Sequence, residues 1–286
     1  MPRVSVLILT KDEARDLPGC LRSVSWSDDI HVLDSGSADN TRDIARSAGA
    51  KVTTKAYADS SLVFGGDEAA HRNWSLRNTP FKYEWVLLLD ADERVTAELA
   101  AAIDRAVSAP NGFIAFRIQR RDFLERTWLK HVQASPFYLR LFRPERLRYE
   151  RLVNPVTIAD GPVGSLSGYL DHFPFSKQMS HWLNRHNSYS TLEARQIVEN
   201  RRRGTGFSLR RALTASDFHE RRFHQKELYY RLPLRPLVRF IILYFLKRGF
   251  LDGRAGFRYA VLQAIYEYMI VLKVRELTAP GCDDAL

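Results

Sequence analysis

The chain has 286 residues, of which 45% are hydrophobic and 12% aromatic, and a formal net charge of +10. This length and composition fit one large folded domain, or a domain with an appendage, and exclude a disordered chain. Cys20 and Cys282 are far apart and lack metal-ligand spacing, so we expect neither a disulfide framework nor a zinc site. The first residues enter a strand pattern without secretory-signal architecture, so a cytoplasmic protein is expected.

Most of the net positive charge lies at one end of the chain. Residues 201–286 hold 17 Lys and Arg against 8 Asp and Glu, a net of +9, whereas the preceding 200 residues hold 26 against 25, a net of +1. A basic region of this kind serves nucleic-acid binding, an anionic membrane surface, or solubility alone.

Strand and helix patterns alternate along the first part of the chain. Apolar runs predict strands at 4–10, 30–34, 51–55 and from Trp85, and helical spacing follows Asp16, Asn40 and Asp67. Asp16 is placed to cap a helix with proline in its first turn, and Asn40 with Asp43 resembles a capping box. This order predicts an α/β fold with a doubly wound parallel sheet. Neither a dinucleotide fingerprint nor a P-loop is present.

The strand that begins at Trp85 ends in two carboxylates. Its three consecutive leucines, 87–89, indicate a strand buried on both faces, and Asp90 and Asp92 emerge where it stops. Ligands of open α/β sheets bind beyond the carboxyl ends of the strands. Two such carboxylates can share Mg²⁺ or Mn²⁺, which bridges protein to phosphate oxygens and offsets charge on a departing diphosphate. The alternative is a solvated acidic turn.

Two other strand ends reach the same edge of the predicted sheet. They deliver residues 10–13 and 34–37. Asp34 can accept a hydrogen bond from a nucleobase N–H or a ribose hydroxyl, which leaves the phosphates to the metal.

Four sequence blocks within residues 3–95 resemble family-2 glycosyltransferases with the GT-A fold: VSVLILTKDEARDLPGCLRSV, HVLDSGSADNT, AAHRNWSL and WVLLLDADE. The stretches 139–143 and 172–194 extend the resemblance, which is to a bacterial branch that builds lipopolysaccharide cores and exopolysaccharide repeats. It implies a Rossmann-like, mostly parallel sheet flanked by helices. It also implies inverting transfer of a sugar from a nucleotide-diphosphate-sugar, commonly a UDP-sugar, to a hydroxyl of a glycan or lipid-linked acceptor.

The resemblance assigns roles to eight residues. Thr10 and Glu13 would line the nucleoside pocket, Asp34 would hold the nucleobase, Arg72 and Asn73 would support the donor, Asp90 would face the ribose or sugar, and Asp92 and His172 would bind Mn²⁺ or Mg²⁺. For His172 the alternative is a turn histidine. Relatives often carry acidic residues near positions 136 and 155, where this chain has proline, so the general base is not assigned. Its candidates are Glu150, Asp122 and His131.

A change of composition after residues 201–204 marks a predicted boundary. Residues 1–203 would form the GT-A domain, with a nucleotide-binding half (1–95) and an acceptor half (96–203), and 204–286 a basic helical region. Apolar segments 237–246 and 259–274 are too short or too interrupted to span a bilayer. They predict amphipathic helices in peripheral contact with the anionic inner face of the membrane. The alternative is packing against one another or against a second copy of the chain.

Functions of other classes are less well supported. A nucleotidyltransferase usually carries a glycine-rich basic loop near its start, which this chain lacks. Nucleic-acid binding is not expected, because no reading motif accompanies the basic region. A non-catalytic scaffold would not need the intact Asp90 and Asp92.

Overall fold

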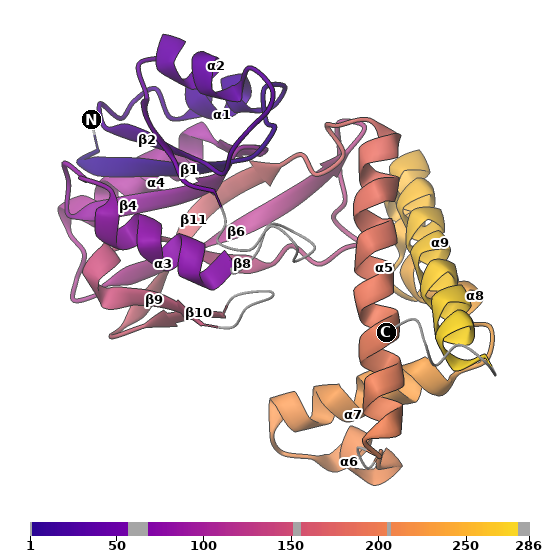
Figure 1. The fold of residues 1–286 in the computed structure, drawn as a ribbon. Coiled ribbons are helices and arrows are strands. Elements are labelled where there is room, and N and C mark those ends of the chain that lie inside the picture. The colour runs from indigo at the N-terminus through magenta and orange to yellow at the C-terminus, as the bar shows by residue number, and fades with distance from the viewer. Residues whose placement is uncertain (1, 57–67, 151–155, 205–206, 280–286) are drawn as a thin grey trace. The chain divides into compact units, whose positions relative to one another are not determined.

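The computed structural model describes residues 2–56, 68–150, 156–204 and 207–279, and every structural statement concerns these residues (Figure 1). The predicted segment 153–155, Asp67 and Cys282 lie outside them. The chain divides into two compact units. The first unit comprises Met1–Trp128 and Ser135–Lys177, and the second comprises Leu129–Ala134 and Gln178–Leu286.

The first unit contains all the described strands and four α-helices. The strands are β1 (Val4–Thr10), β2 (Ile30–Asp34), β3 (Lys51–Thr54), β4 (Trp85–Asp90), β5 (Glu93–Val95), β6 (Ala115–Leu124), β7 (Thr127–Trp128), β8 (Phe137–Phe142), β9 (Leu147–Glu150), β10 (Val156–Ala159) and β11 (Val163–His172). The helices are α1 (Leu17–Ser23), α2 (Thr41–Ser47), α3 (Glu68–Asn78), α4 (Ala97–Ser108) and the 3₁₀ turn η1 (Pro144–Arg146).

The main sheet has the strand order β3-β2-β1-β4-β8-β6-β11-β5. Its first four strands are parallel, and Ile8 of β1 pairs with Val32 of β2 and Leu89 of β4. The strands β8 and β5 run antiparallel to their neighbours, whereas β6 and β11 are parallel to each other. The α/β fold with a mostly parallel sheet is therefore confirmed, and the parallel half carries the three strand ends that the sequence singles out.

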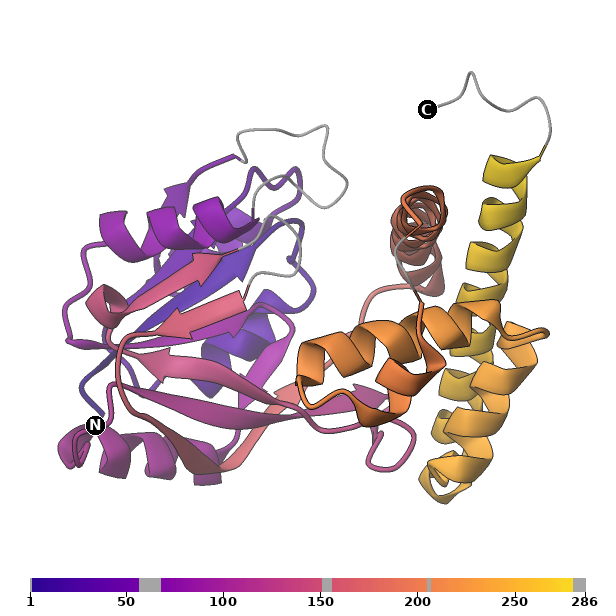
Figure 2. The same ribbon diagram turned by 90° about the horizontal axis from the view of Figure 1, so that it is seen from below.

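The strand β4 is buried on both faces, as its run of leucines predicts. Leu87 and Leu89 join an apolar cluster with α1 and α4, and Leu88 joins a second cluster with α3 and β9. Successive side chains of a strand point to opposite faces, so one apolar run supplies both clusters. The helices α3 and α4 accordingly lie on opposite faces of the sheet (Figure 2). Burial on both sides fixes where β4 ends.

The predicted helix caps are wrong in detail. Asp16 stands at the N-cap of α1, but its side chain makes no capping bond and instead accepts from Ser176 Oγ at 2.6 Å. Asn40 stands at the N-cap of α2 and also makes no side-chain cap. Thr96 does cap α4, because its hydroxyl accepts from Leu99 N.

The second unit is helical. Its elements are α5 (Met179–Arg202), α6 (Leu209–Thr214), α7 (Phe218–Arg231), α8 (Arg235–Ile241), the π-helical turn η2 (Ile242–Leu246), the 3₁₀ turn η3 (Gly249–Asp252) and α9 (Gly253–Thr278). The compact unit includes α5, which lies before the boundary predicted after residue 203. Its Ile197 and Val198 are buried against Ile270 and Val274 of α9.

A buried ion pair completes this helical core. Arg235 Nη2 of α8 donates to Glu267 Oε2 of α9 at 2.7 Å, and both side chains are nearly inaccessible. Among the described residues, none of the helices is both long and apolar enough to span a membrane.

Candidate active site

The site forms where β4 ends. Leu89 is fully buried, whereas the side chains of Asp90 and Asp92 are 33% and 22% exposed. The thiol of Cys20 on α1 lies 3.7 Å from the carbonyl oxygen of Asp90, and Phe173 N donates to the carbonyl oxygen of Asp92. Helix α1 and the segment after β11 therefore both position the acidic turn.

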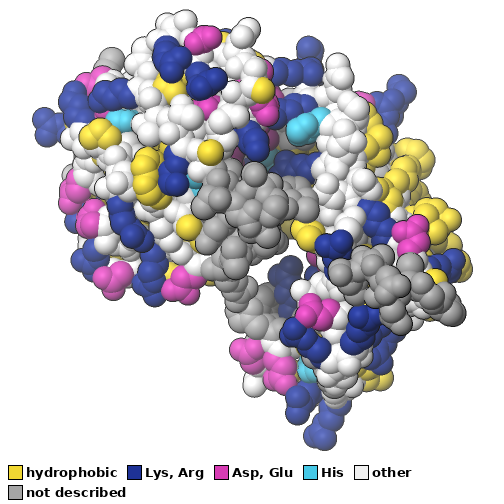
Figure 3. Space-filling view, viewed as in Figure 1, with side chains coloured by type: hydrophobic (Ala, Val, Ile, Leu, Met, Phe, Trp, Pro, Cys, Tyr) yellow, Lys and Arg dark blue, Asp and Glu magenta, His cyan; other side chains and the backbone are white. Residues whose placement is uncertain are grey.

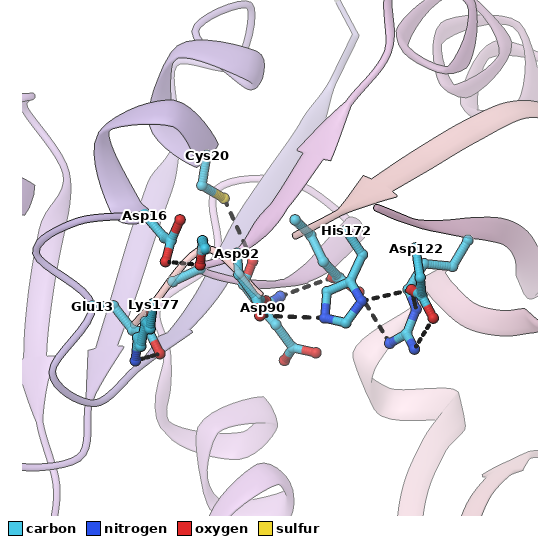
Figure 4. Close-up of polar contacts among 12 residues, drawn as sticks. Glu13, Asp16, Cys20, Asp90, Asp92, Asp122, His172 and Lys177 are labelled. Carbon is cyan, nitrogen blue, oxygen red and sulfur yellow. Dashed lines mark hydrogen bonds and ion pairs between the residues drawn. The ribbon is translucent and has the colours of Figure 1, made fainter. Parts of the chain in front are cut away.

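Asp92, His172 and Asp122 form a continuous row (Figure 4). His172 Nε2 lies 3.3 Å from Asp92 Oδ2, and His172 Nδ1 lies 2.6 Å from Asp122 Oδ1. The row follows from strand register, because His172 at the end of β11 pairs with Asp122 on β6 and Glu93 on β5. The structure thus brings together the two predicted metal ligands and shows that His172 is not a solvated turn residue.

The charged forms of these three side chains stabilise one another. Burial alone would lower the pKa of His172, but Asp92 and Asp122 outweigh burial and raise that pKa to about 9. Burial likewise opposes ionisation of Asp92 and of Asp122, yet the neighbouring His172 lowers the pKa of both carboxyls. Arg120, whose Nε lies 2.9 Å from Asp122 Oδ1, contributes to the lowering at Asp122.

The donor set of Asp92 and His172 fits a divalent cation. One carboxylate oxygen and one imidazole nitrogen suit Mn²⁺ well, and these two atoms lie 3.3 Å apart, close enough for both to contact one ion. The described residues contain no group of three or more His, Cys, Asp or Glu side chains that could hold an ion alone. An ion here would take its remaining ligands from a phosphate group and water.

Two arginines hold Asp90. Arg140 Nη2 on β8 contacts Asp90 Oδ2 and Glu93 Oε1, each at 2.7 Å, and Arg72 Nη2 lies 3.8 Å from Asp90 Oδ1. Burial opposes ionisation of Asp90, but Arg140 and then Arg72 outweigh it and lower the pKa. Burial raises the pKa of the inaccessible Glu93, and Arg140 counters part of that rise. Asp90 is therefore held ionised and oriented by arginines of two elements, β8 and α3.

Sequence reasoning gave no role to Arg140 or Glu93. The signal was present: Arg140 interrupts the apolar run of β8 between Leu139 and Leu141, and it is 5% exposed. A buried arginine requires carboxylate partners. Which carboxylates these are follows only from the antiparallel pairing of β4 with β8.

The loops after β1 and β2 are bound to each other. Ser37 Oγ accepts from Asp12 N, Asp12 Oδ1 accepts from Ala38 N, and Thr41 Oγ1 accepts from Glu13 N. Asp12 adopts a positive φ of 54°, which turns the chain back toward the second loop. The predicted nucleoside pocket therefore has a firmly held rim.

Asp34 accepts hydrogen bonds from the residues that form this rim. It is fully buried, Oδ2 accepts from Gly36 N and Ser37 N, and Oδ1 accepts from the hydroxyls of Ser37 and Thr10. These bonds occupy both oxygens, so Asp34 holds the turn. Contact of Asp34 with a nucleobase stays a prediction, and it requires exchange of one of these bonds.

Glu13 is a titratable group beside the rim. Its Oε1 accepts from Lys177 Nζ at 2.7 Å (Figure 4). Burial raises the pKa of Glu13 to about 7, although Lys177 acts in the opposite direction. The predicted pocket residue is thus poised to change charge near neutral pH.

Asn73 has a structural partner, in addition to its predicted role near the donor. Its side-chain amide donates to Tyr149 O and accepts from Tyr149 N, both at 2.8 Å, and so clamps β9 to α3. Arg72, one residue earlier, also contacts Glu68 at 2.6 Å. Of the predicted pair, only Arg72 reaches the acidic turn.

The candidate bases differ in environment. Asp122 is 3% exposed and lies between His172 and Arg120, which makes it a weak base. Glu150, at the end of β9, is 52% exposed and contacts Arg148. His131 belongs to the second unit. The described residues thus leave the base unassigned.

Comparison with known proteins agrees with this geometry. Residues 5–169 match the family model "Glycosyl transferase family 2". The lipopolysaccharide core biosynthesis glycosyltransferase LpsC of Rhizobium meliloti is 26% identical, over 99% of this chain and 97% of its own length. An uncharacterised glycosyltransferase of Rickettsia typhi is 23% identical over 97% of this chain and 88% of its own length.

The fold is also similar to that of a solved glycosyltransferase. A mannosyltransferase from Pyrobaculum calidifontis, solved in complex with GDP-Man and Mn²⁺, superposes with a TM-score of 0.51 at 16% identity, covering 97% of this chain and 88% of its own. The family match covers more than half of the chain, and it replaces the nucleotidyltransferase and scaffold alternatives. The chain therefore belongs to glycosyltransferase family 2 and is a glycosyltransferase.

Proposed function

We propose that the protein transfers a sugar, with inversion, from a UDP-sugar to a hydroxyl of a glycan or lipid-linked acceptor in cell-surface polysaccharide synthesis. The observation that carries this proposal is the pair Asp92 and His172, 3.3 Å apart at the end of β4. It lies beside the strand ends that carry the residue 10–13 and 34–37 loops, where an open α/β sheet binds its ligand.

Each part of the site has a task in this reaction. Asp92 and His172 would hold Mn²⁺ or Mg²⁺, which would supply positive charge to offset the charge on the departing diphosphate. Asp122 fixes His172 through Nδ1, so that Nε2 faces Asp92. Asp90, held by Arg140 and Arg72, orients the ribose or sugar. Thr10, Glu13 and Asp34 line the nucleoside pocket, and Arg72 with Asn73 supports the donor side.

The acceptor is proposed from two supports. The chain resembles LpsC of Rhizobium meliloti along nearly its whole length, and that relative is named for lipopolysaccharide core biosynthesis. Residues 201–286 carry a net charge of +9, which suits work beside an anionic lipid surface. We therefore place the enzyme in the cytoplasm, in peripheral contact with the inner face of the membrane, with a lipid-linked glycan as acceptor.

The test is a donor screen with the full chain. Hydrolysis of nucleotide sugars, with and without Mn²⁺, is compared between the parent protein and Asp92→Ala. The parent should turn over a UDP-sugar only with the cation, and Asp92→Ala should lose turnover while keeping its circular dichroism spectrum. Near-normal turnover by folded Asp92→Ala would show that Asp92 is not a metal ligand. Calorimetric binding of GDP but not UDP would overturn the uridine preference.

A further inference from the structure

An exposed apolar surface occupies one corner of the second unit. The turns η2 and η3 present Phe245, Leu246, Phe250 and Leu251, with exposures of 56%, 73%, 46% and 55%. We call these four residues the apolar corner. Figure 3 shows hydrophobic side chains gathered over α9, with charged side chains beside them. Contiguous exposed apolar surface of this kind marks an interaction site.

The corner rests on close backbone contacts. Asp252 accepts from the backbone amides of His131 and Val132 at 2.9 and 2.8 Å, which ties η3 to the segment Leu129–Ala134. A Cβ on Gly256 of α9 would lie 2.0 Å from Gly249 O, so these two segments touch through their backbones. These backbone contacts hold η3 in place beneath the exposed side chains.

A ring cluster adjoins the corner. Tyr244 lies 5.6 Å from Phe257 and 6.3 Å from Phe250 between ring centroids, and Phe240 stacks on Tyr244 at 5.4 Å. Tyr244, Phe250 and Phe257 line a surface pocket of about 510 Å³ together with Gly253, Arg254 and Arg258. The pocket therefore combines an apolar wall with guanidinium groups.

Basic side chains outnumber acidic ones around the corner. Residues 236–266 contain five basic side chains and one acidic side chain, Asp252, whose oxygens already accept backbone amides. Lys247, Arg248 and Arg254 make no ion pair with any carboxylate of the described residues. Elsewhere in the same unit, Lys226 pairs with Glu193 and Arg211 with Glu220.

We propose that the apolar corner inserts into an anionic phospholipid leaflet, with Lys247, Arg248 and the pocket arginines against the lipid phosphates. Aliphatic side chains such as Leu246 and Leu251 gain from acyl chains but give no stacking to nucleobases, which disfavours a nucleic-acid surface. A second copy of the chain would bring the same unpaired cations face to face, which disfavours self-association. The proposal extends the inner-face location and is independent of the donor chemistry.

The test measures partitioning of the full chain onto vesicles of phosphatidylglycerol mixed with phosphatidylethanolamine, and onto neutral phosphatidylcholine vesicles. Phe245→Ser/Leu246→Ser removes the apolar tip. Its control is Leu209→Ser/Leu213→Ser, which removes two leucines of 54% and 72% exposure from α6 of the same unit. Lys247→Gln/Arg248→Gln removes the unpaired cations. Its control is Arg211→Gln/Lys226→Gln, which removes the same charge from paired positions.

The parent should bind the anionic vesicles and leave the neutral ones. Phe245→Ser/Leu246→Ser should partition onto the anionic vesicles at least about tenfold more weakly than the parent, at low and at high salt alike. The cation variant should lose about thirtyfold at low salt, or about fivefold per charge. Both controls should bind as the parent does, and all variants should keep parental donor turnover and circular dichroism.

Three results would overturn the proposal. The first is equal partitioning of the parent and the corner variants. The second is binding of a single-stranded RNA oligonucleotide that the corner variants lose, without binding to vesicles. The third is a dimer in sedimentation velocity that the corner variants convert to monomer, again without vesicle binding.

Discussion

A histidine between two carboxylates is the main feature of the site at the scale of single residues. A metal-binding histidine usually donates its second ring N–H to a carboxylate, which fixes the ring and strengthens the ligand. Asp122 supplies that carboxylate for His172 at 2.6 Å. We therefore propose that Asp122 positions His172 and is not the general base.

Asp122→Asn should weaken the apparent affinity for Mn²⁺ by roughly 10- to 100-fold. Because the substitution loosens His172 without removing a ligand, saturating Mn²⁺ should restore most of kcat. Titration of Mn²⁺ against UDP binding measures the affinity without relying on turnover.

The adjacent rung of the same strand pair gives a matched control. Asp171 pairs in register with Arg121 as His172 does with Asp122, and the Arg121 side chain contacts the Asp171 carboxylate. Asp171→Asn should leave the Mn²⁺ titration unchanged. Equal loss in both variants would show a general disturbance of β11 and contradict the positioning role.

Glu13 makes the stability of the first unit depend on pH. Its pKa is raised from 4.5 to about 7 in the folded protein, so between these values the native state holds a proton that the unfolded chain has released. The free energy of unfolding should therefore fall as pH rises through this window, by up to about 3 kcal/mol, and level off above it.

Glu13→Gln should flatten this dependence. Thermal unfolding of the parent and of Glu13→Gln is compared across the window, with Glu98→Gln as control because Glu98 is exposed on α4. The gap between parent and Glu13→Gln should change with pH, whereas Glu98→Gln should run parallel to the parent. A constant gap for Glu13→Gln would refute the burial of a protonated carboxyl.

At the scale of elements, the ends of strands were predictable and their lateral contacts were not. Strands 4–10 and 30–34 have the predicted bounds, because apolar runs that stop at a polar turn set them locally. The bridge from Arg140 to Glu93 depends on how β8 lies against β4, which no local pattern specifies. The resemblance to known glycosyltransferases, and not spacing, suggested that His172 and Asp92 share one site.

Arg140→Met should destabilise the first unit by about 3–5 kcal/mol, because it leaves two carboxylates at β4 and β5 without their main cation. The additional change Glu93→Gln should recover part of the loss by removing one buried charge. Thermal or denaturant unfolding measures both effects.

Arg117→Met is the control for this prediction, since Arg117 is exposed on β6. It should change stability little. If Arg140→Met proves as mild as Arg117→Met, Arg140 does not hold the acidic turn.

At the scale of the whole molecule, the compact units divide the chain earlier than the change of composition after residue 203. The run of three arginines and Gly204 marks the end of helix α5, and the sequence changes character there. The compact second unit nevertheless includes α5, because its apolar residues contact α9, far along the chain. The helical C-terminal region expected from the sequence is present, but only tertiary packing shows that α5 packs with it.

Because each unit has an apolar core of its own, we expect two thermal transitions in calorimetry. UDP with Mn²⁺ should raise the transition temperature of the first unit alone. The free energy of unfolding of that unit should rise by about 2.7 kcal/mol when the ligand is at roughly a hundred times its Kd.

Ile103→Ala and Ile270→Ala are a matched pair, since these side chains are 0% and 2% exposed in the two cores. Each should lose about 2–5 kcal/mol from its own unit alone. A single transition that the ligand and both variants shift alike would mean that the two cores unfold as one, and would contradict the division of the chain at residues 177 and 178.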